Sequence, residues 1–95
     1  MTNLFSKTYT IRFIINNQLT TTDYLYMQIK EFCDERCLTL YNLEVTDLIS
    51  KSPNFNATII ESSFVQIKGR KKDYEILKNF LYAFDKSNAI VIMTI

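Results

Sequence analysis

The chain has 95 residues, of which 47% are hydrophobic and 22% charged, a composition typical of one globular domain with a buried core. Eleven Lys and Arg residues against ten Asp and Glu residues give a net charge of +1, which excludes nucleic-acid binding by bulk positive charge. The sequence has no histidine and one glycine, which excludes histidine triads, histidine metal sites and glycine-rich phosphate loops. We therefore expect a protein that is not an enzyme and that uses neither a cofactor nor a metal.

The two cysteines, Cys33 and Cys37, lie four residues apart in a predicted helix. A structural zinc site is disfavoured, because the chain offers two thiols and no histidine toward four ligands, and a disulfide framework needs more pairs. We expect them to be reduced packing residues. The first seven residues lack the features of a signal peptide, and no uncharged apolar run approaches ~18 residues. The sequence thus predicts a cytoplasmic protein without a membrane span.

The first predicted strand covers residues 8–16, where apolar and polar side chains alternate. Its predicted inner face consists of Tyr9, Ile11, Phe13 and Ile15. A helix is predicted over 21–37, since Thr20 to Thr22 offer N-cap residues and an apolar stripe follows. That stripe consists of Leu25, Ile29, Phe32 and Cys33.

The second predicted strand covers residues 38–48, with Tyr41, Leu43 and Val45 on one side. Residues 50–54 contain the only proline and several turn formers, which predicts a loop. The third strand is predicted over about 57–68, with room for a bulge at Ser62 and Ser63.

Gly69 ends the third strand, and a second helix is predicted from Asp73. The apolar stripe of that helix consists of Ile76, Leu77, Phe80, Leu81 and Phe84. A lone glycine at this corner indicates a positive φ or a close approach of the backbone. The apolar, β-branched residues 89–95 predict a fourth strand.

The predicted order is therefore β-α-β-β-α-β over a single domain, residues 1–95. Short connections and right-handed crossovers favour an α+β, ferredoxin-like fold. In that fold four antiparallel strands form one sheet, and both helices cover the same face. The first and third strands would then be central, and the second and fourth would form the edges.

The other face of that sheet is predicted to be bare. Its residues would be Thr10, Arg12, Ile14, Asn42, Glu44, Thr46, Ser62, Phe64, Gln66 and Lys68. If Val91, Met93 and Ile95 face the helices, then Ile90 and Ile92 point outward beside Ile14. An uncovered apolar strand invites association, so the predicted protein interface comprises Ile14, Phe64, Ile90 and Ile92.

A cluster of positive charge lies at the strand-to-helix corner: Lys68, Arg70, Lys71 and Lys72. Cations at a helix N-terminus oppose the helix dipole, and two explanations account for their presence: a solvated turn, or contact with an anionic partner. With Arg12, these residues form the predicted anion or nucleic-acid site.

Residues 64–67, Phe-Val-Gln-Ile, resemble the end of the RNP1 motif of RNA-recognition modules. The resemblance implies that Phe64 stacks on a base and Arg12 contacts a phosphate. The sequence departs from the motif at Glu61 and Ser62, and no glycine precedes Phe64.

We expect a protein–protein interaction module that acts through its sheet face or edge, alone or as a homodimer. The abundance of Asn, Ile, Lys and Tyr indicates AT-rich coding, as in phages and mobile elements, where such modules serve as adaptors or inhibitors. The alternative is a small RNA- or DNA-binding module that uses Phe64, Arg12 and residues 68–72. A third hypothesis is regulatory binding of a small ligand by a dimer.

Overall fold

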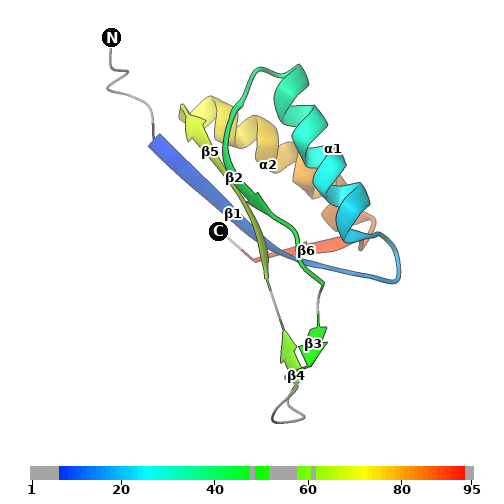
Figure 1. The fold of residues 1–95 in the computed structure, drawn as a ribbon. Helices are drawn as coiled ribbons and strands as arrows, with labels where there is room; N and C mark the ends of the chain where they lie inside the picture. The colour runs from blue at the N-terminus through cyan, green and yellow to red at the C-terminus, as the bar shows by residue number, and fades with distance from the viewer. Residues whose placement is uncertain (1–6, 48, 52–57, 61, 94–95) are drawn as a thin grey trace.

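The computed structural model describes residues 7–47, 49–51, 58–60 and 62–93 (Figure 1). The elements, in chain order, are β1 (Lys7–Ile15), α1 (Thr22–Glu35), β2 (Thr39–Glu44), β3 (Ile49–Lys51), β4 (Thr58–Ile60), β5 (Ser63–Gly69), α2 (Lys71–Lys86) and β6 (Ile90–Ile92).

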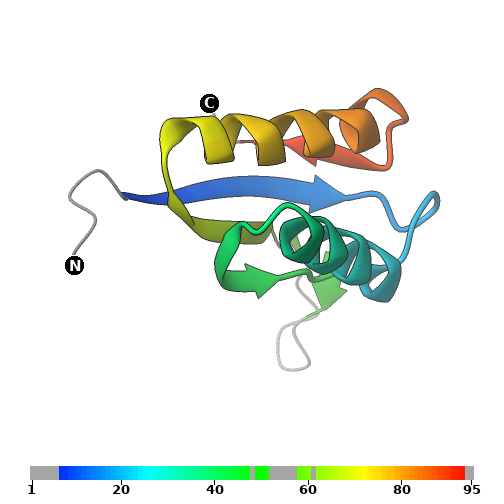
Figure 2. The same cartoon turned by 90° about the horizontal axis from the view of Figure 1, so that it is seen from above.

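The main sheet has the strand order β2-β5-β1-β6, and each neighbouring pair is antiparallel. Strands β5 and β1 are therefore central, and β2 and β6 form the edges. Both helices lie over the same side of this sheet, as the two orthogonal views show (Figures 1 and 2). The predicted α+β class, with a four-stranded antiparallel sheet and two helices, is confirmed.

The core lies between the helices and one face of the sheet. It is formed by Ile11, Phe13, Ile15, Leu25, Ile29, Cys33, Leu38, Val65, Ile67, Leu77, Leu81 and Ile90. Burial of each large aliphatic side chain stabilises the fold by about 1.5–3 kcal/mol. Between the helices, the rings of Phe32 and Phe80 stack with centroids 4.0 Å apart. The stack joins α1 to α2 above the sheet.

Helix α1 is preceded by the N-cap residue Thr21, whose hydroxyl accepts a hydrogen bond of 3.1 Å from the N–H of Tyr24. It ends at Glu35, two residues earlier than predicted. Cys37 follows with a φ of 57°, and the N–H of Leu38 donates to the carbonyl of Cys33 at 2.8 Å, which is the Schellman pattern of helix ends. The two cysteines therefore do not share a helical face: Cys33 is buried, and Cys37 is exposed.

Helix α2 ends in the same way. Asn88 has a φ of 65°, and the N–H of Ala89 donates to the carbonyl of Phe84 at 3.0 Å. The start of α2 explains why position 69 is a glycine. Gly69 does not have a positive φ, so close approach is the reason. A Cβ on Gly69 would lie 2.6 Å from Oδ2 of Asp73. That oxygen accepts a hydrogen bond of 2.9 Å from the N–H of Arg70, the N-cap residue of α2.

The middle of the chain departs from the predicted strands. Strand β2 carries a bulge between Leu40 and Asn42, so Leu40 and Leu43 both pack against the core while Tyr41 is exposed. No bulge was expected there. The long third strand is divided into β4 and β5, and β4 pairs with β3 in a separate two-stranded sheet. Ser50 and Lys51, expected in a loop, belong to β3; residues 52–54 lie outside the described part of the chain.

Strand β6 faces the opposite way to the prediction. Ile90 lies opposite Ile15 and Ile92 opposite Phe13, and directly opposed residues share a face of the sheet. Ile90 is consequently fully buried and Ile92 packs against the core, whereas Val91 is 58% exposed and Met93 49%. The predicted outward orientation of Ile90 and Ile92 is wrong. The register decided it, and a uniformly apolar strand shows no alternation from which to read that register.

Candidate functional site

The side of the main sheet that faces away from the helices is called the open face here. Its residues come from all four strands: Thr8, Thr10, Arg12 and Ile14 of β1; Tyr41, Asn42 and Glu44 of β2; Phe64, Gln66 and Lys68 of β5; and Val91 and Met93 at β6. The alternation of β1 and β5 selects this face, because their other residues fill the core.

The central row of the open face consists of Glu44, Phe64 and Arg12, one from each of three neighbouring strands. The Arg12 guanidinium lies 5.4 Å from the centroid of the Phe64 ring, a cation–π contact. Neighbouring strands are about 4.8 Å apart, which puts the strand positions of Glu44 and Arg12 roughly 10 Å apart. The row therefore presents an anion, an aromatic ring and a cation side by side.

A polar area continues from the central row toward the end of the sheet at Gly69. Gln66 donates from Nε2 to the Thr10 hydroxyl at 3.0 Å, and Asn42 lies opposite Gln66 on the other side. Beyond them, Nζ of Lys68 lies 4.4 Å from the centroid of the Tyr41 ring. Phe64 and Tyr41 on the open face thus each make a cation–π contact with a basic side chain.

An apolar area lies on the other side of the central row, at the end of β1. Ile14 lies opposite Val91, and the N–H of Met93 donates to the carbonyl of Arg12 at 2.8 Å. Val91 and Met93 are exposed, and Ile14 is half-buried. Helices α1 and α2 both lie on the other side of the sheet and leave these apolar side chains uncovered by either of them.

The basic corner lies where β5 meets α2. It consists of Lys7, Lys68, Arg70, Lys71 and Lys72, all exposed. Lys7 joins because it lies opposite Gly69 across the β1–β5 pair. Within the described residues none of the five forms a salt bridge. The Asp73 carboxylate already occupies the anion position at the start of α2.

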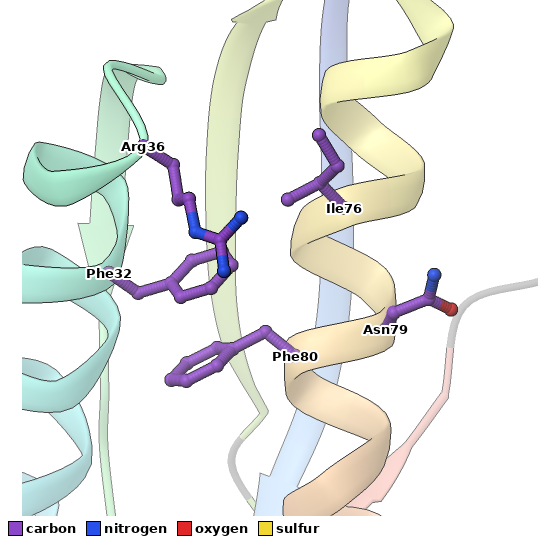
Figure 3. A pocket seen from close by; sticks show the side chains of 5 residues that line it. All are labelled: Phe32, Arg36, Ile76, Asn79 and Phe80. Carbon is purple, nitrogen blue, oxygen red and sulfur yellow. The ribbon is translucent and has the colours of Figure 1, made fainter.

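A groove of about 340 Å³ lies between the helices, on the side away from the open face (Figure 3). Phe32, Arg36, Ile76, Asn79 and Phe80 line it. The Arg36 guanidinium lies 5.4 Å from the centroid of the Phe32 ring, and the Asn79 side chain points away from α1 (Figure 3). The lining residues provide one cation and no carboxylate, thiol or hydroxyl, so they offer neither an acid–base pair nor a nucleophile.

Other chemistry is sparse. Among the residues that the structure describes, no three His, Cys, Asp or Glu side chains come together as a metal site. Burial, with a smaller contribution from Asp34, raises the pKa of the Cys33 thiol to about 11, so this thiol stays protonated at neutral pH. In the same part of the chain, no helix is both long enough and apolar enough to span a bilayer.

The structure places the residues of the predicted protein interface on two sides of the sheet, whereas those of the predicted anion site lie on one connected surface. Of the predicted protein interface, Ile14 and Phe64 lie on the open face, while Ile90 and Ile92 lie on the core side. The predicted anion site stays together: Arg12 and Lys68 lie on the open face, and the corner carries Arg70, Lys71 and Lys72.

Sequence reasoning missed four residues of this surface: Lys7, Tyr41, Val91 and Met93. Lys7 joins the corner only through long-range strand pairing, and Tyr41 reaches the open face only through the bulge in β2. No local pattern in the sequence reports either event.

Comparisons with protein-family models, with curated proteins and with solved structures find no match for this chain.

Proposed function

We propose that the chain is a non-enzymatic protein–protein interaction module with a ferredoxin-like arrangement, and that it binds its partner through the open face. The strand order β2-β5-β1-β6, with a helix after β1 and after β5, supports that arrangement. A partner layer on the free side of the sheet would complete a sandwich, with helices on one side and the partner on the other.

The observation that carries this proposal is the apolar area on the open face. Val91 and Met93 are 58% and 49% exposed, and they adjoin Ile14 on the side of the sheet that faces away from both helices. Exposed apolar side chains that are contiguous, rather than scattered, mark binding surfaces.

The open face is favoured over the β6 edge as the docking surface. Oδ2 of Asp85 accepts a hydrogen bond of 3.0 Å from the N–H of Ile92. A strand added at this edge would have to displace that carboxylate, so the edge is protected against strand addition.

The test is an affinity pull-down from native lysate, treated with nuclease, with wild-type chain and the double variant Val91→Lys/Met93→Lys as baits. We expect the wild type to retain a protein and the double variant to lose it. Tyr82→Lys, on the outer side of α2 at a 41% exposed position, is the matched control and should retain the protein. Equal retention by all three baits would contradict the proposal.

A second candidate function is binding of single-stranded RNA or DNA. It is supported by the basic corner, where Lys68 contacts the Tyr41 ring, and by Phe64 with Arg12 further along the same face. Aromatic faces stack on bases while cations contact phosphates. In fluorescence anisotropy with a single-stranded oligonucleotide, this function predicts an affinity that falls steeply with salt and with Lys71→Ala/Lys72→Ala. Affinity that does not change with salt would rule it out.

A further inference from the structure

The central row has a charge pattern that is complementary to itself when reversed. It carries Glu44 at one end, Phe64 in the middle and Arg12 at the other end. Glu44 makes no hydrogen bond or salt bridge within the described residues. An identical row turned around would therefore bring opposite charges together.

We propose that the partner of the open face is a second copy of this chain, docked face to face around a two-fold axis that runs parallel to the strands, between β5 and β1. The inference rests on the proposed function, because it names the partner of that same surface. In a two-fold contact the same patch serves both copies, so the patch must be self-complementary.

With this axis the two sheets cover each other completely, because the strands β2, β5, β1 and β6 of one copy face β6, β1, β5 and β2 of the other. Phe64 then faces Arg12 of the partner subunit, which lies only one strand spacing, about 4.8 Å, to the side of Glu44. Because packed sheets lie about 10 Å apart, Arg12 of the partner subunit approaches Glu44 diagonally across the interface and adds a second cation to its surroundings, while each Phe64 gains a cation–π contact.

The same operation covers the apolar area. Strand β6 lies over β2 of the partner, so Val91 and Met93 are removed from water. An axis at right angles to the strands, through the central row, would instead place Arg12 opposite Arg12 of the partner subunit and Glu44 opposite Glu44 of the partner subunit. The charge pattern therefore selects the axis parallel to the strands.

The test is a charge exchange followed by sedimentation equilibrium on nuclease-treated protein. We expect the wild type to be a dimer, and Glu44→Arg and Arg12→Glu each to weaken it at least about tenfold, because a two-fold contact repeats each repulsion. An equimolar mixture of the two variants should associate within about threefold of the wild type, because both ion pairs are restored between unlike chains. Glu31→Arg makes the same charge change on the exposed side of α1 and should leave the dimer unchanged.

Several results would overturn the proposal. They are a wild type that stays monomeric at roughly 0.1 mM, single variants that associate normally, a mixture that fails to recover, or an equal loss with Glu31→Arg. Association that disappears with nuclease would identify nucleic acid as the occupant instead. A monomeric wild type that still retains a foreign protein through Val91 and Met93 would refute the dimer alone and leave the proposed function standing.

A second measurement does not depend on Arg12, which makes a further contact within its own chain. The axis places Glu44 of one copy opposite Met93 of the other. In a Cys37→Ser background, a mixture of Glu44→Cys and Met93→Cys chains should form a cross-link with a short bis-maleimide. A mixture of Glu44→Cys and Tyr82→Cys chains should not, and equal yields from both mixtures would refute the geometry.

Discussion

The Asp85 carboxylate of α2 accepts a hydrogen bond of 3.0 Å from the backbone N–H of Ile92 in β6. A helix side chain thus covers a donor on the edge of the main sheet. Edge donors without a partner promote pairing between chains, so this contact serves both stability and solubility.

Removal of the Asp85 carboxylate should expose the β6 edge. We expect Asp85→Ala to lower the free energy of unfolding by about 1–2 kcal/mol, since the part-buried N–H loses its acceptor, and to increase light scattering at high concentration. Asp85→Asn keeps an oxygen acceptor and should stay close to the wild type. Denaturant titration with parallel light scattering provides the measurement, and identical behaviour of the two variants would contradict this role.

The orientation of β6 predicts opposite results at neighbouring positions. Ile90 is fully buried and Val91 is 58% exposed. Ile90→Lys should cost more than about 3 kcal/mol, because it places a charge in the core, while Val91→Lys should stay within about 0.5 kcal/mol. Thermal unfolding at low protein concentration separates the two effects from association. If Val91→Lys were the more damaging change, the register of β6 would be wrong.

Gly69 and Asp73 should be energetically coupled. A Cβ at Gly69 would lie 2.6 Å from Oδ2 of Asp73, which caps α2. Gly69→Ala should therefore displace the cap and cost about 1 kcal/mol, similar to the cost of Asp73→Ala. In a double-mutant cycle, Gly69→Ala should cost clearly less once Asp73 is already Ala, because only the contact of 3.3 Å with the Cβ of residue 73 then remains. Additive effects would show that Gly69 has another role.

The two cysteines should differ in reactivity. Cys33 is buried with its thiol pKa raised to about 11, whereas Cys37 is exposed. Iodoacetamide at pH 8 should modify the folded chain once, at Cys37, and peptide mass spectrometry should locate the adduct. Cys37→Ser should abolish the rapid reaction. Rapid labelling of Cys33 in the folded chain would contradict its burial.

The raised pKa of Cys33 also predicts how the free energy of unfolding changes at alkaline pH. The protonated thiol favours the folded state, so its contribution is complete below the unfolded value of 9.0 and is lost as the pH rises toward about 11. The free energy of unfolding of Cys33→Ala, although lower overall, should therefore fall less over that interval than that of the wild type. Parallel slopes in denaturant titrations would remove Cys33 as the cause.

Local periodicity was enough to predict much of the core. The alternation in the first strand predicted the burial of Ile11, Phe13 and Ile15, and the structure confirms all three. The 3.6-residue stripes likewise predicted Leu25 and Leu81, which are fully buried. Such patterns succeed because one strand or helix face must leave water, whatever the element packs against.

The open face could be predicted only in part. Arg12 and Phe64 belong to strands with clear alternation, and they were placed correctly. The bulge that turns Tyr41 outward and the pairing that brings Lys7 to the basic corner depend on partners far along the chain. The residues of a single strand do not determine with which distant residues that strand pairs.

The sequence by itself determined the class of fold, the number of strands in the main sheet and the main apolar faces of the helices, because these follow from periodicity within single elements. Only the tertiary structure decided which residues of the last strand face water. Ile90, Val91 and Ile92 are equally apolar, and a strand of uniform hydrophobicity favours neither face. The hydrogen bonds from Asn16 to Ala89 and from Met93 to Arg12 set the register, and the register placed Ile90 in the core and Val91 on the open face.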